Sequence, residues 1–458
     1  MVPLALDLVY LVVAVIALPW VIWRKLAGGR PVAAPAARFL GRTRLAARLP
    51  GSKRVWLHGV SVGEVQLLAT VATELNRQAE AAGLAVDCVV SSSTTTGLAV
   101  AERRFGAGQI FPCPLDFSWA VRRVLQQVDA DLLVLGELEL WPNLLRAAAD
   151  RGLPVVVVNG RMSPRSFRGF SRVRILAAAM LKRVRLVLAR SKEDAERFTL
   201  LGAPRVTTVG SLKFDGVSGD RQATPVQRLR QLVGFNSPTP VLLAGSTQEP
   251  EEALAVAAFL ALRPRHPALR LILVPRHAER SRALANWLAE RLREPDGKGI
   301  RWMRRSDLDS GDQPSPPTDI LLVDVTGELA GWWGVATIAF VGGSLDGRRG
   351  GQNMLEPAAY GAAVCFGPHT RNFRTDVAEL LAADAARVVT DGESLTAFVA
   401  RCLDEPAFAD TLGKHARGVV DDNRGGTAAT VSHLLALLSD DSQLPVVGNG
   451  QNTDTEGS

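Results

Sequence analysis

Short apolar segments alternate with amphipathic segments along most of this chain. In the first half, runs typical of buried strands occur at 55–57, 86–90, 132–135, 155–158, 186–188 and 206–209. Apolar residues recur at helical spacing between them, for example at 65–79 and 193–201. Strands that are apolar on both faces are typical of parallel sheets covered by helices on both sides. The pattern predicts a doubly wound α/β domain.

The alternation stops and then restarts in the second half. Residues 215–240 are rich in proline, glycine and polar residues, and we interpret them as an interdomain linker. Further strands are predicted at 241–244, 271–274, 320–323, 338–341 and 363–366, with a polar insert at 294–318 that holds at most one short strand. We therefore expect an N-terminal domain at 29–214, a second Rossmann-like domain at 241–438, and a disordered tail at 439–458.

The N-terminus departs from this alternation. Residues 4–23 are almost entirely apolar, with Asp7 as the one charge, and several arginines and a lysine follow. Length and flanking charge predict a membrane anchor helix within 1–28, with the rest of the chain on the cytoplasmic side of the membrane. Asp7 and Pro19 also fit an alternative, in which the helix lies in the membrane interface or is buried in the protein.

Composition narrows the chemistry. The net charge of +7 on 458 residues is a mild bias, and we expect no nucleic-acid partner. The four cysteines and six histidines lack the spacing of metal ligands, so no metal site and no cofactor are predicted. Most of the cysteines lie in or beside apolar runs, which indicates that they are buried, reduced thiols.

Polar residues follow several predicted strands of the first half. Glu64 stands after a glycine-containing turn, where a helix begins, and it either caps that helix or points into a ligand site. Glu137 and Glu139 follow the strand at 132–135, and Lys213 follows the strand at 206–209. Since ligands bind at the carboxyl ends of parallel strands, these are candidate site residues. A hydroxyl-rich turn at 91–97 fits either a ligand site or an N-cap.

The second half offers groups suited to a nucleotide. A glycine-rich segment at 342–357 follows a predicted strand, and its consecutive N–H groups are expected to bind phosphate or carboxylate, with Arg348 and Arg349 adding charge. Glu356 is suited to a ribose diol, and Arg276 directly follows another strand. The alternative is a surface loop with a capping glutamate. The segment lacks the GxxxxGK[ST] pattern, which argues against ATP hydrolysis.

Seven motifs in this order resemble those of the Kdo (3-deoxy-D-manno-octulosonate) transferases of lipopolysaccharide biosynthesis. They are HGVSVGE at 58–64, ELELWPN at 137–143, GSLKFD at 210–215, VPRH at 274–277, GGSL at 342–345, NMLEP at 353–357 and GPH at 367–369. The glycine loop appears one residue longer than usual, with Gln352 and Met354 where histidine and proline are common. Gly136 and Leu138 also depart from common members.

The resemblance implies a GT-B fold, in which two Rossmann-like domains face a cleft. It implies an inverting, metal-independent transfer of one or more Kdo units from CMP-Kdo to a primary hydroxyl of the lipid A precursor, lipid IVA. Glu64 would be the general base, and Glu137 and Lys213 would stabilise the transition state. The residues expected to hold CMP are Pro275, Arg276, Thr326, Gly327, Glu328, Asn353, Met354, Leu355 and Glu356. The alternatives are a GT-B enzyme that uses a UDP-sugar, and an inactive, membrane-tethered glycolipid-binding module.

Overall fold

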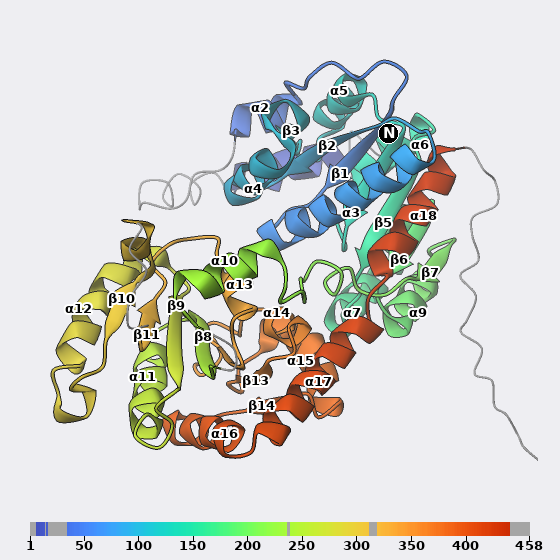
Figure 1. Ribbon diagram of the computed structural model, residues 1–458. Coiled ribbons are helices and arrows are strands. Elements are labelled where there is room, and N and C mark those ends of the chain that lie inside the picture. The colour runs from blue at the N-terminus through green and yellow to red at the C-terminus, as the bar shows by residue number, and fades with distance from the viewer. Residues whose placement is uncertain (1–5, 14, 17–33, 236–238, 311–317, 440–458) are drawn as a thin grey trace, which may run out of the picture. The chain divides into compact units, whose positions relative to one another are not determined.

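The structure is a computed structural model that describes residues 6–13, 15–16, 34–235, 239–310 and 318–439 (Figure 1). The described chain forms two compact units. The first comprises residues up to 216 together with those from 424 onward, and the second comprises residues 217–423. Each unit is built around one parallel sheet.

The sheet of the first unit has the order β3-β2-β1-β4-β5-β6-β7, with every neighbouring pair parallel. Its strands are β1 (Lys53–His58), β2 (Val86–Ser92), β3 (Ile110–Pro112), β4 (Leu132–Gly136), β5 (Val155–Gly160), β6 (Leu186–Ala189) and β7 (Val206–Thr208). The strand order reverses between β1 and β4, which is where doubly wound sheets open a crevice at their carboxyl edge. In that register His58 lies beside Ser91 on one side and Leu135 on the other.

Helices cover both faces of this sheet, whose central strands β4, β5 and β6 are buried at every residue. They are α2 (Pro35–Leu40), α3 (Val62–Ala81), α4 (Thr95–Phe105), α5 (Ser118–Val128), α6 (Pro142–Asp150), α7 (Pro164–Arg172), α8 (Arg174–Leu181), α9 (Lys192–Leu200) and α18 (Gly426–Leu438). Two apolar clusters result. One forms around Trp56 and Leu133, and the other joins Val55 and Leu68 to Leu434 of α18. A buried ion pair, Arg54 to Asp87 at 2.6 Å, joins β1 to β2.

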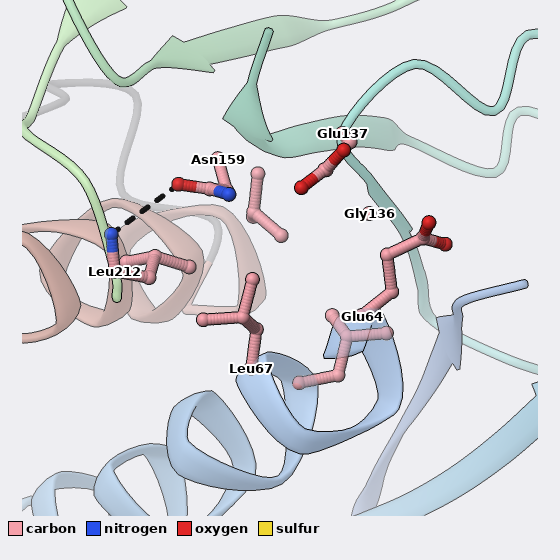
Figure 2. A pocket seen from close by; sticks show the side chains of 8 residues that line it. Glu64, Leu67, Gly136, Glu137, Asn159 and Leu212 are labelled. Atoms are coloured by element: carbon pink, nitrogen blue, oxygen red, sulfur yellow. Dashed lines mark hydrogen bonds between the residues drawn. The ribbon is translucent and has the colours of Figure 1, made fainter. Parts of the chain in front are cut away.

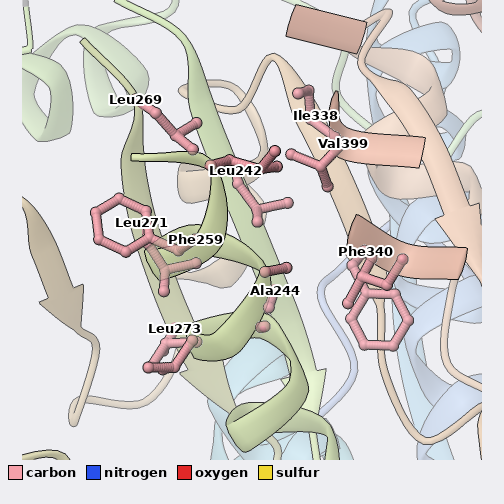
Figure 3. Packing of buried hydrophobic residues seen from close by; sticks show 14 of the residues in the cluster. Leu242, Ala244, Phe259, Leu269, Leu271, Leu273, Ile338, Phe340 and Val399 are labelled. Carbon is pink, nitrogen blue, oxygen red and sulfur yellow. The ribbon is translucent and has the colours of Figure 1, made fainter. Parts of the chain in front are cut away.

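The second unit repeats the architecture, with the parallel order β10-β11-β9-β8-β12-β13-β14. Its strands are β8 (Val241–Thr247), β9 (Arg270–Pro275), β10 (Trp302–Arg304), β11 (Ile320–Leu322), β12 (Ile338–Val341), β13 (Ala363–Phe366) and β14 (Ala386–Val388). Its helices are α10 (Thr224–Leu232), α11 (Glu251–Leu262), α12 (Ser281–Arg291), α13 (Leu329–Trp333), α14 (Leu355–Ala359), α15 (Arg374–Ala382), α16 (Gly392–Asp404) and α17 (Pro406–Asp422). In the core, Phe259 and Val399 pack from helices against β8, β9 and β12 (Figure 3).

Two differences from the sequence-based domain boundaries have physical causes. Residues 424–438, predicted to close the second domain, belong to the first unit because Val431, Leu434 and Leu438 of α18 pack into its core. The expected linker at 215–240 contains α10, whose buried Val226 and Leu229 and contacts with α13 make it part of the second unit.

Residues 6–13 and 15–16 near the N-terminus are helical. The rest of the predicted anchor at 1–28, and residues 440–458 of the predicted tail, lie outside the described residues. Within the described ranges, no helix combines the length and apolar character needed to cross a membrane. Asp7 is buried, whereas Leu8, Val12 and Ile16 are exposed.

Candidate active site

The turns after β1 and β4 come together at the carboxyl edge of the first sheet. They line a small pocket with residues from β5, α3 and the segment after β7 (Figure 2). The lining residues are Glu64, Leu67, Leu68, Gly136, Glu137, Val158, Asn159 and Leu212. The structure thus brings the two predicted carboxylates, Glu64 and Glu137, to one pocket, at the point where the strand order reverses.

Glu64 sits in the first turn of α3 and makes capping hydrogen bonds. Ser61 Oγ accepts from the Glu64 amide at 3.3 Å, while Glu64 Oε2 accepts from the Val60 amide at 2.6 Å and Oε1 from Ser61 Oγ at 3.1 Å. Of the two sequence-based alternatives for Glu64, the structure shows the cap, because these bonds fix the carboxylate at the start of α3. Glu64 also lines the pocket, and its role in binding or catalysis stays a prediction.

Gly136 permits the close approach of these two turns. A Cβ at this position would meet the His58 carbonyl oxygen at 3.3 Å and Glu64 Cβ at 3.8 Å. The departure from common family members at Gly136 therefore falls against the backbone of β1 and the candidate base. The tighter of these two contacts is with the backbone of β1, while the contact with Glu64 is of ordinary van der Waals length.

Glu137 and Glu139 form an acidic turn whose ionisation is unfavourable. Glu137 adopts a left-handed backbone conformation with φ of 54°, which costs energy for a residue other than glycine. Burial, followed by the charge of Glu64, raises the pKa of Glu137, against the opposing effects of Lys213, Arg161 and Arg190. Burial and Glu64 also raise the pKa of Glu139 to about 7.

Asn159 links β5 to the segment that carries Lys213. Its side chain is buried, its backbone φ is 52°, and its Oδ1 accepts from the Leu212 amide at 3.3 Å (Figure 2). This bond fixes the residue directly before Lys213, whose charge lowers the pKa of Glu137. The sequence gives no signal for this role of Asn159, because its partner lies 53 positions along the chain.

The hydroxyl-rich turn at 91–97 is used to hold the fold. Thr94 Oγ1 caps α4 by accepting from the Gly97 amide, and it donates to the Val60 carbonyl, as Ser92 Oγ also does. Of the two interpretations left open by the sequence, the N-cap is the one the structure shows. These bonds support the turn that leads into Glu64.

In the second unit, the prediction that consecutive N–H groups of the glycine loop bind a ligand's phosphate is wrong for residues 343–345. The buried carboxylate of Glu251 accepts from the amides of Gly343, Ser344 and Leu345 at 2.7, 2.9 and 3.1 Å. The same carboxylate accepts from the Gln248 amide at 2.9 Å. Glu251 therefore takes the place of the expected anion and fixes the loop between β12 and α14.

Arg348 and Arg349, which were expected to add charge to that site, are placed differently. Arg349 forms an ion pair with Asp346 at 2.6 Å, and Arg348 is exposed. This ion pair joins two residues of the same loop.

Asn353 and Glu356 form the polar centre of the predicted nucleotide set. Asn353 Nδ2 donates to Glu356 Oε1 at 3.1 Å, and Trp333 Nε1 donates to Oε2 at 3.0 Å. Burial raises the pKa of Glu356, while these two donors and the charge of Arg276 lower it. Met354 and Leu355 are fully buried, so only their backbone is available to a ligand.

The remaining predicted nucleotide residues lie at two other turns. Arg276 follows Pro275 at the end of β9, and its side chain is exposed. Thr326 and Gly327 are exposed, but Glu328 is engaged by Arg305, which donates to both of its oxygens at 2.8 and 2.9 Å, and by Trp332. The carboxylate of Glu328 is thereby committed to holding the turn.

Two Rossmann-like units, each with a seven-stranded parallel sheet, are the architecture of the GT-B fold. Solved structures with this fold are similar to the chain. A UDP-N-acetylglucosamine 2-epimerase gives a TM-score of 0.56 at 12% identity, covering 88% of this chain and 100% of its own. A glycosyltransferase of Rickettsia africae gives a TM-score of 0.51 at 13% sequence identity, and the similarity covers 85% of this chain and 97% of that structure.

The family follows from sequence similarity. The family model described as 3-deoxy-D-manno-octulosonic-acid transferase (kdotransferase) matches residues 37–216. The 3-deoxy-D-manno-octulosonic acid transferase of Bordetella pertussis is 35% identical over 425 residues, which cover 90% of this chain and 94% of the relative. The 3-deoxy-D-manno-octulosonic acid transferase of Haemophilus influenzae is 30% identical over 396 residues, which cover 86% of this chain and 88% of the relative. The chain belongs to the Kdo transferase family of lipopolysaccharide biosynthesis, which confirms the resemblance seen in its motifs.

Proposed function

We propose that this protein transfers Kdo from CMP-Kdo to a primary hydroxyl of lipid IVA and releases CMP. The observation that carries the proposal is the pocket where Glu64 and Glu137 meet at the strand-order reversal, in a chain of the Kdo transferase family. Family membership supports the Kdo chemistry, and the pocket supplies the carboxylate that such a transfer needs.

Glu64 is the proposed general base. The acceptor hydroxyl attacks the anomeric carbon of Kdo, the new C–O bond forms as the bond to the CMP phosphate oxygen breaks, and the hydroxyl proton passes to Glu64. Because the cap bonds from Val60 and Ser61 already fix its orientation, the carboxylate needs little reorganisation before it accepts the proton. Inversion follows from this single displacement.

Lys213 and Glu137 are the proposed stabilisers of the transition state. The reacting sugar carries a carboxylate and develops positive charge on its ring, so it needs a cation and an anion near the same carbon. Lys213, whose charge acts on Glu137, supplies the cation, and Glu137 supplies the anion. Both lie at the carboxyl edge of the sheet that also positions Glu64.

For the donor, Asn353 and Glu356 are proposed to bind the ribose hydroxyls, and Arg276 the phosphate. Glu356 is suited to a diol because its two oxygens are already oriented by Asn353 and Trp333. Met354 and Leu355 would contribute backbone groups, as would Pro275, Thr326, Gly327 and Glu328. Arg276 is exposed and its charge reaches Glu356, which fits a role on the leaving phosphate.

We also propose that the protein attaches to the inner leaflet of the inner membrane. Exposed apolar side chains support this in two places, on the helical residues 6–13 and 15–16 and at the start of α8, where Ile175 is 91% exposed and Leu176 53%. Exposed Arg172 and Arg174 precede Ile175, and such a mixture suits an anionic lipid surface. Co-sedimentation with vesicles containing phosphatidylglycerol tests this. If Ile175→Glu binds the vesicles as well as the wild type does, α8 is not part of the membrane contact.

The transfer itself is tested by incubating the full chain with CMP-Kdo and lipid IVA in the presence of EDTA. We expect CMP release and a lipid product heavier by one or more Kdo residues. Folded protein that gives no product contradicts the proposal. A larger thermal shift with UDP than with CMP would favour the UDP-sugar alternative, and lipid binding without turnover would favour the inactive binding module.

A further inference from the structure

A buried polar cluster joins the helical residues 6–13 near the N-terminus to the beginnings of α5 and α6. The cluster consists of Asp7, Tyr10, Asp116, Ser118 and Asn143, of which Asp7, Asp116 and Asn143 are at most 7% exposed. Asp7 and Tyr10 are three positions apart, so they lie on the same face of their helix. The predicted anchor segment thus presents its one charged side chain to the protein.

Asp7 provides the cap that α5 lacks locally. The N-cap residue of α5, Phe117, makes no side-chain bond. Instead, the Ser118 amide donates to Asp7 Oδ1 at 2.9 Å, and Ser118 Oγ donates to Oδ2. A carboxylate at a helix start satisfies an amide that would otherwise be unpaired and interacts favourably with the helix dipole. The partner lies 111 positions along the chain.

Asp116 does the same for α6, which also lacks a local cap. Its Oδ2 accepts from the Asn143 amide at 3.0 Å and its Oδ1 from the Leu144 amide at 2.9 Å. Two bonds then connect this cap to the N-terminal helix: Tyr10 OH donates to Asp116 Oδ2 at 3.1 Å, and Asn143 Nδ2 donates to Asp7 Oδ1 at 3.1 Å. Burial raises the pKa of Asp116 to about 6, and the charge of Asp7 contributes.

The start of α6 is also the end of the acidic turn. Trp141 is the N-cap residue of α6, its carbonyl accepts from the Leu145 amide, and its Nε1 donates to Glu139 at 3.1 Å. At its other end the turn is held by the Glu137 amide, which donates to the Val158 carbonyl at 2.9 Å. A shift of α6 would therefore move the turn that carries Glu137, whose φ is already strained.

We infer that Asp7 is a positioning residue for the acidic turn: through Ser118, Asn143 and Asp116, the N-terminal helix fixes the start of α6. The segment predicted to be an anchor therefore also shapes the transfer site. Misplacement of a catalytic group by about 1 Å costs up to about 100-fold in rate, so loss of this contact is expected to lower turnover rather than acceptor binding.

The test compares Asp7→Asn with Asp150→Asn in the full chain. Asn keeps the volume of Asp7 but removes its charge and one acceptor. Asp150, at the other end of α6, has a side chain that is 61% exposed and provides the matched control. Hydrogen exchange followed by mass spectrometry reports directly on the amides of Ser118, Asn143 and Leu144. We expect exchange about 10-fold faster or more at these amides in Asp7→Asn, and no change in Asp150→Asn.

Kinetics provide the second readout, and this part rests on the proposed function. With lipid IVA dispersed in a non-ionic detergent, so that membrane attachment no longer limits the reaction, kcat should fall about 10-fold or more in Asp7→Asn with little change in KM. Tyr10→Phe, which loses one bond but keeps the ring packed on Phe117, should give a smaller fall.

Unchanged exchange at the three amides in Asp7→Asn would overturn the inference, whatever the kinetics. So would normal kcat in detergent with weaker binding to vesicles, because that is the result for a segment that serves only as an anchor. If the wild type transfers no Kdo, the proposed function is contradicted. The hydrogen-exchange result then still decides whether Asp7 fixes the start of α6. If Asp7→Asn does not fold, Tyr10→Phe and Ser118→Ala carry the same comparison.

Discussion

Replacing Glu251 by glutamine should destabilise the second unit strongly while changing almost no volume. Each carboxylate oxygen of Glu251 accepts from two backbone amides: Oε2 from Gln248 and Gly343, and Oε1 from Ser344 and Leu345. The side-chain amide of the introduced glutamine can take two orientations. In each of them its NH₂ group faces two backbone N–H donors, from which it cannot accept a hydrogen bond. Two hydrogen bonds to a charged acceptor are lost in either orientation.

The magnitude follows from those two bonds. Hydrogen bonds to charged groups contribute about 1.5–3 kcal/mol each, so the free energy of unfolding should fall by about 3–6 kcal/mol. With a urea m-value of about 2–3 kcal/mol/M for a unit of this size, the midpoint of its unfolding transition should fall by roughly 1–3 M. This is a large fraction of the stability of one domain.

Urea unfolding, with hydrogen exchange of the peptide containing 343–345 to assign the transition to the second unit, measures the effect. Glu290→Gln on the exposed face of α12 is the control, and we expect no shift from it. A loss of less than about 1 kcal/mol in Glu251→Gln would refute the reasoning, because it would mean that the loop does not depend on this carboxylate.

Three further predictions concern the first unit. Asp87→Ala leaves the buried guanidinium of Arg54 unpaired, so the free energy of unfolding should fall by about 3–5 kcal/mol in denaturant titrations; a loss below about 1 kcal/mol would contradict this. Glu139 has a pKa of about 7 in the folded protein against 4.5 as its ordinary value, so the native state binds the extra proton and stability falls as pH rises through 7. Glu139→Gln should remove about 1–2 kcal/mol of that fall, after discounting for solvent exposure, and unfolding curves at pH 5 and pH 8 that are unchanged by the substitution would refute it. Asn159→Ala should lower kcat about 10-fold with normal CMP affinity in calorimetry, because the segment bearing Lys213 loses its anchor; an equal loss of CMP affinity would argue against that cause.

The sheets were largely predictable because their strands are buried on both faces. Continuous apolar runs indicated β1, β4 and β12, for example, at nearly their observed positions. The edge strands β3 and β14 were missed because each has three residues, which is too short to form a pattern. Edge strands have only one neighbour, so their sequences are less constrained.

The membership of α18 in the first unit was not predictable from its sequence. Its apolar face at Val431, Leu434 and Leu438 requires a partner, but such a face fits any core of suitable shape. The chain crosses back to the first unit after Asn423, and only the fold shows where the helix packs.

Glu64 and Glu137 were predictable as neighbours at one pocket because each stands in the connection after a buried strand, and parallel strands bring their carboxyl ends to one edge. Glu251 and Asp7 were not, since their partners lie 92 and 111 positions away. In the sequence, Asp7 is a charge that interrupts an apolar run; in the fold, it caps α5. Long-range caps of this kind leave no local signal.

The most direct test of the proposed chemistry is the mass of lipid IVA after incubation with CMP-Kdo and either the wild type or Glu64→Gln. Glutamine keeps one oxygen that can accept from the Val60 amide, and its NH₂ group can donate to Ser61 Oγ, but it is too weakly basic to take the hydroxyl proton. We predict Kdo-bearing lipid with the wild type, and turnover lower by about 100-fold or more with Glu64→Gln while CMP still binds. Wild-type protein that leaves the lipid mass unchanged, or Glu64→Gln with near-normal turnover, would contradict the assignment of Glu64 as the base of a Kdo transfer.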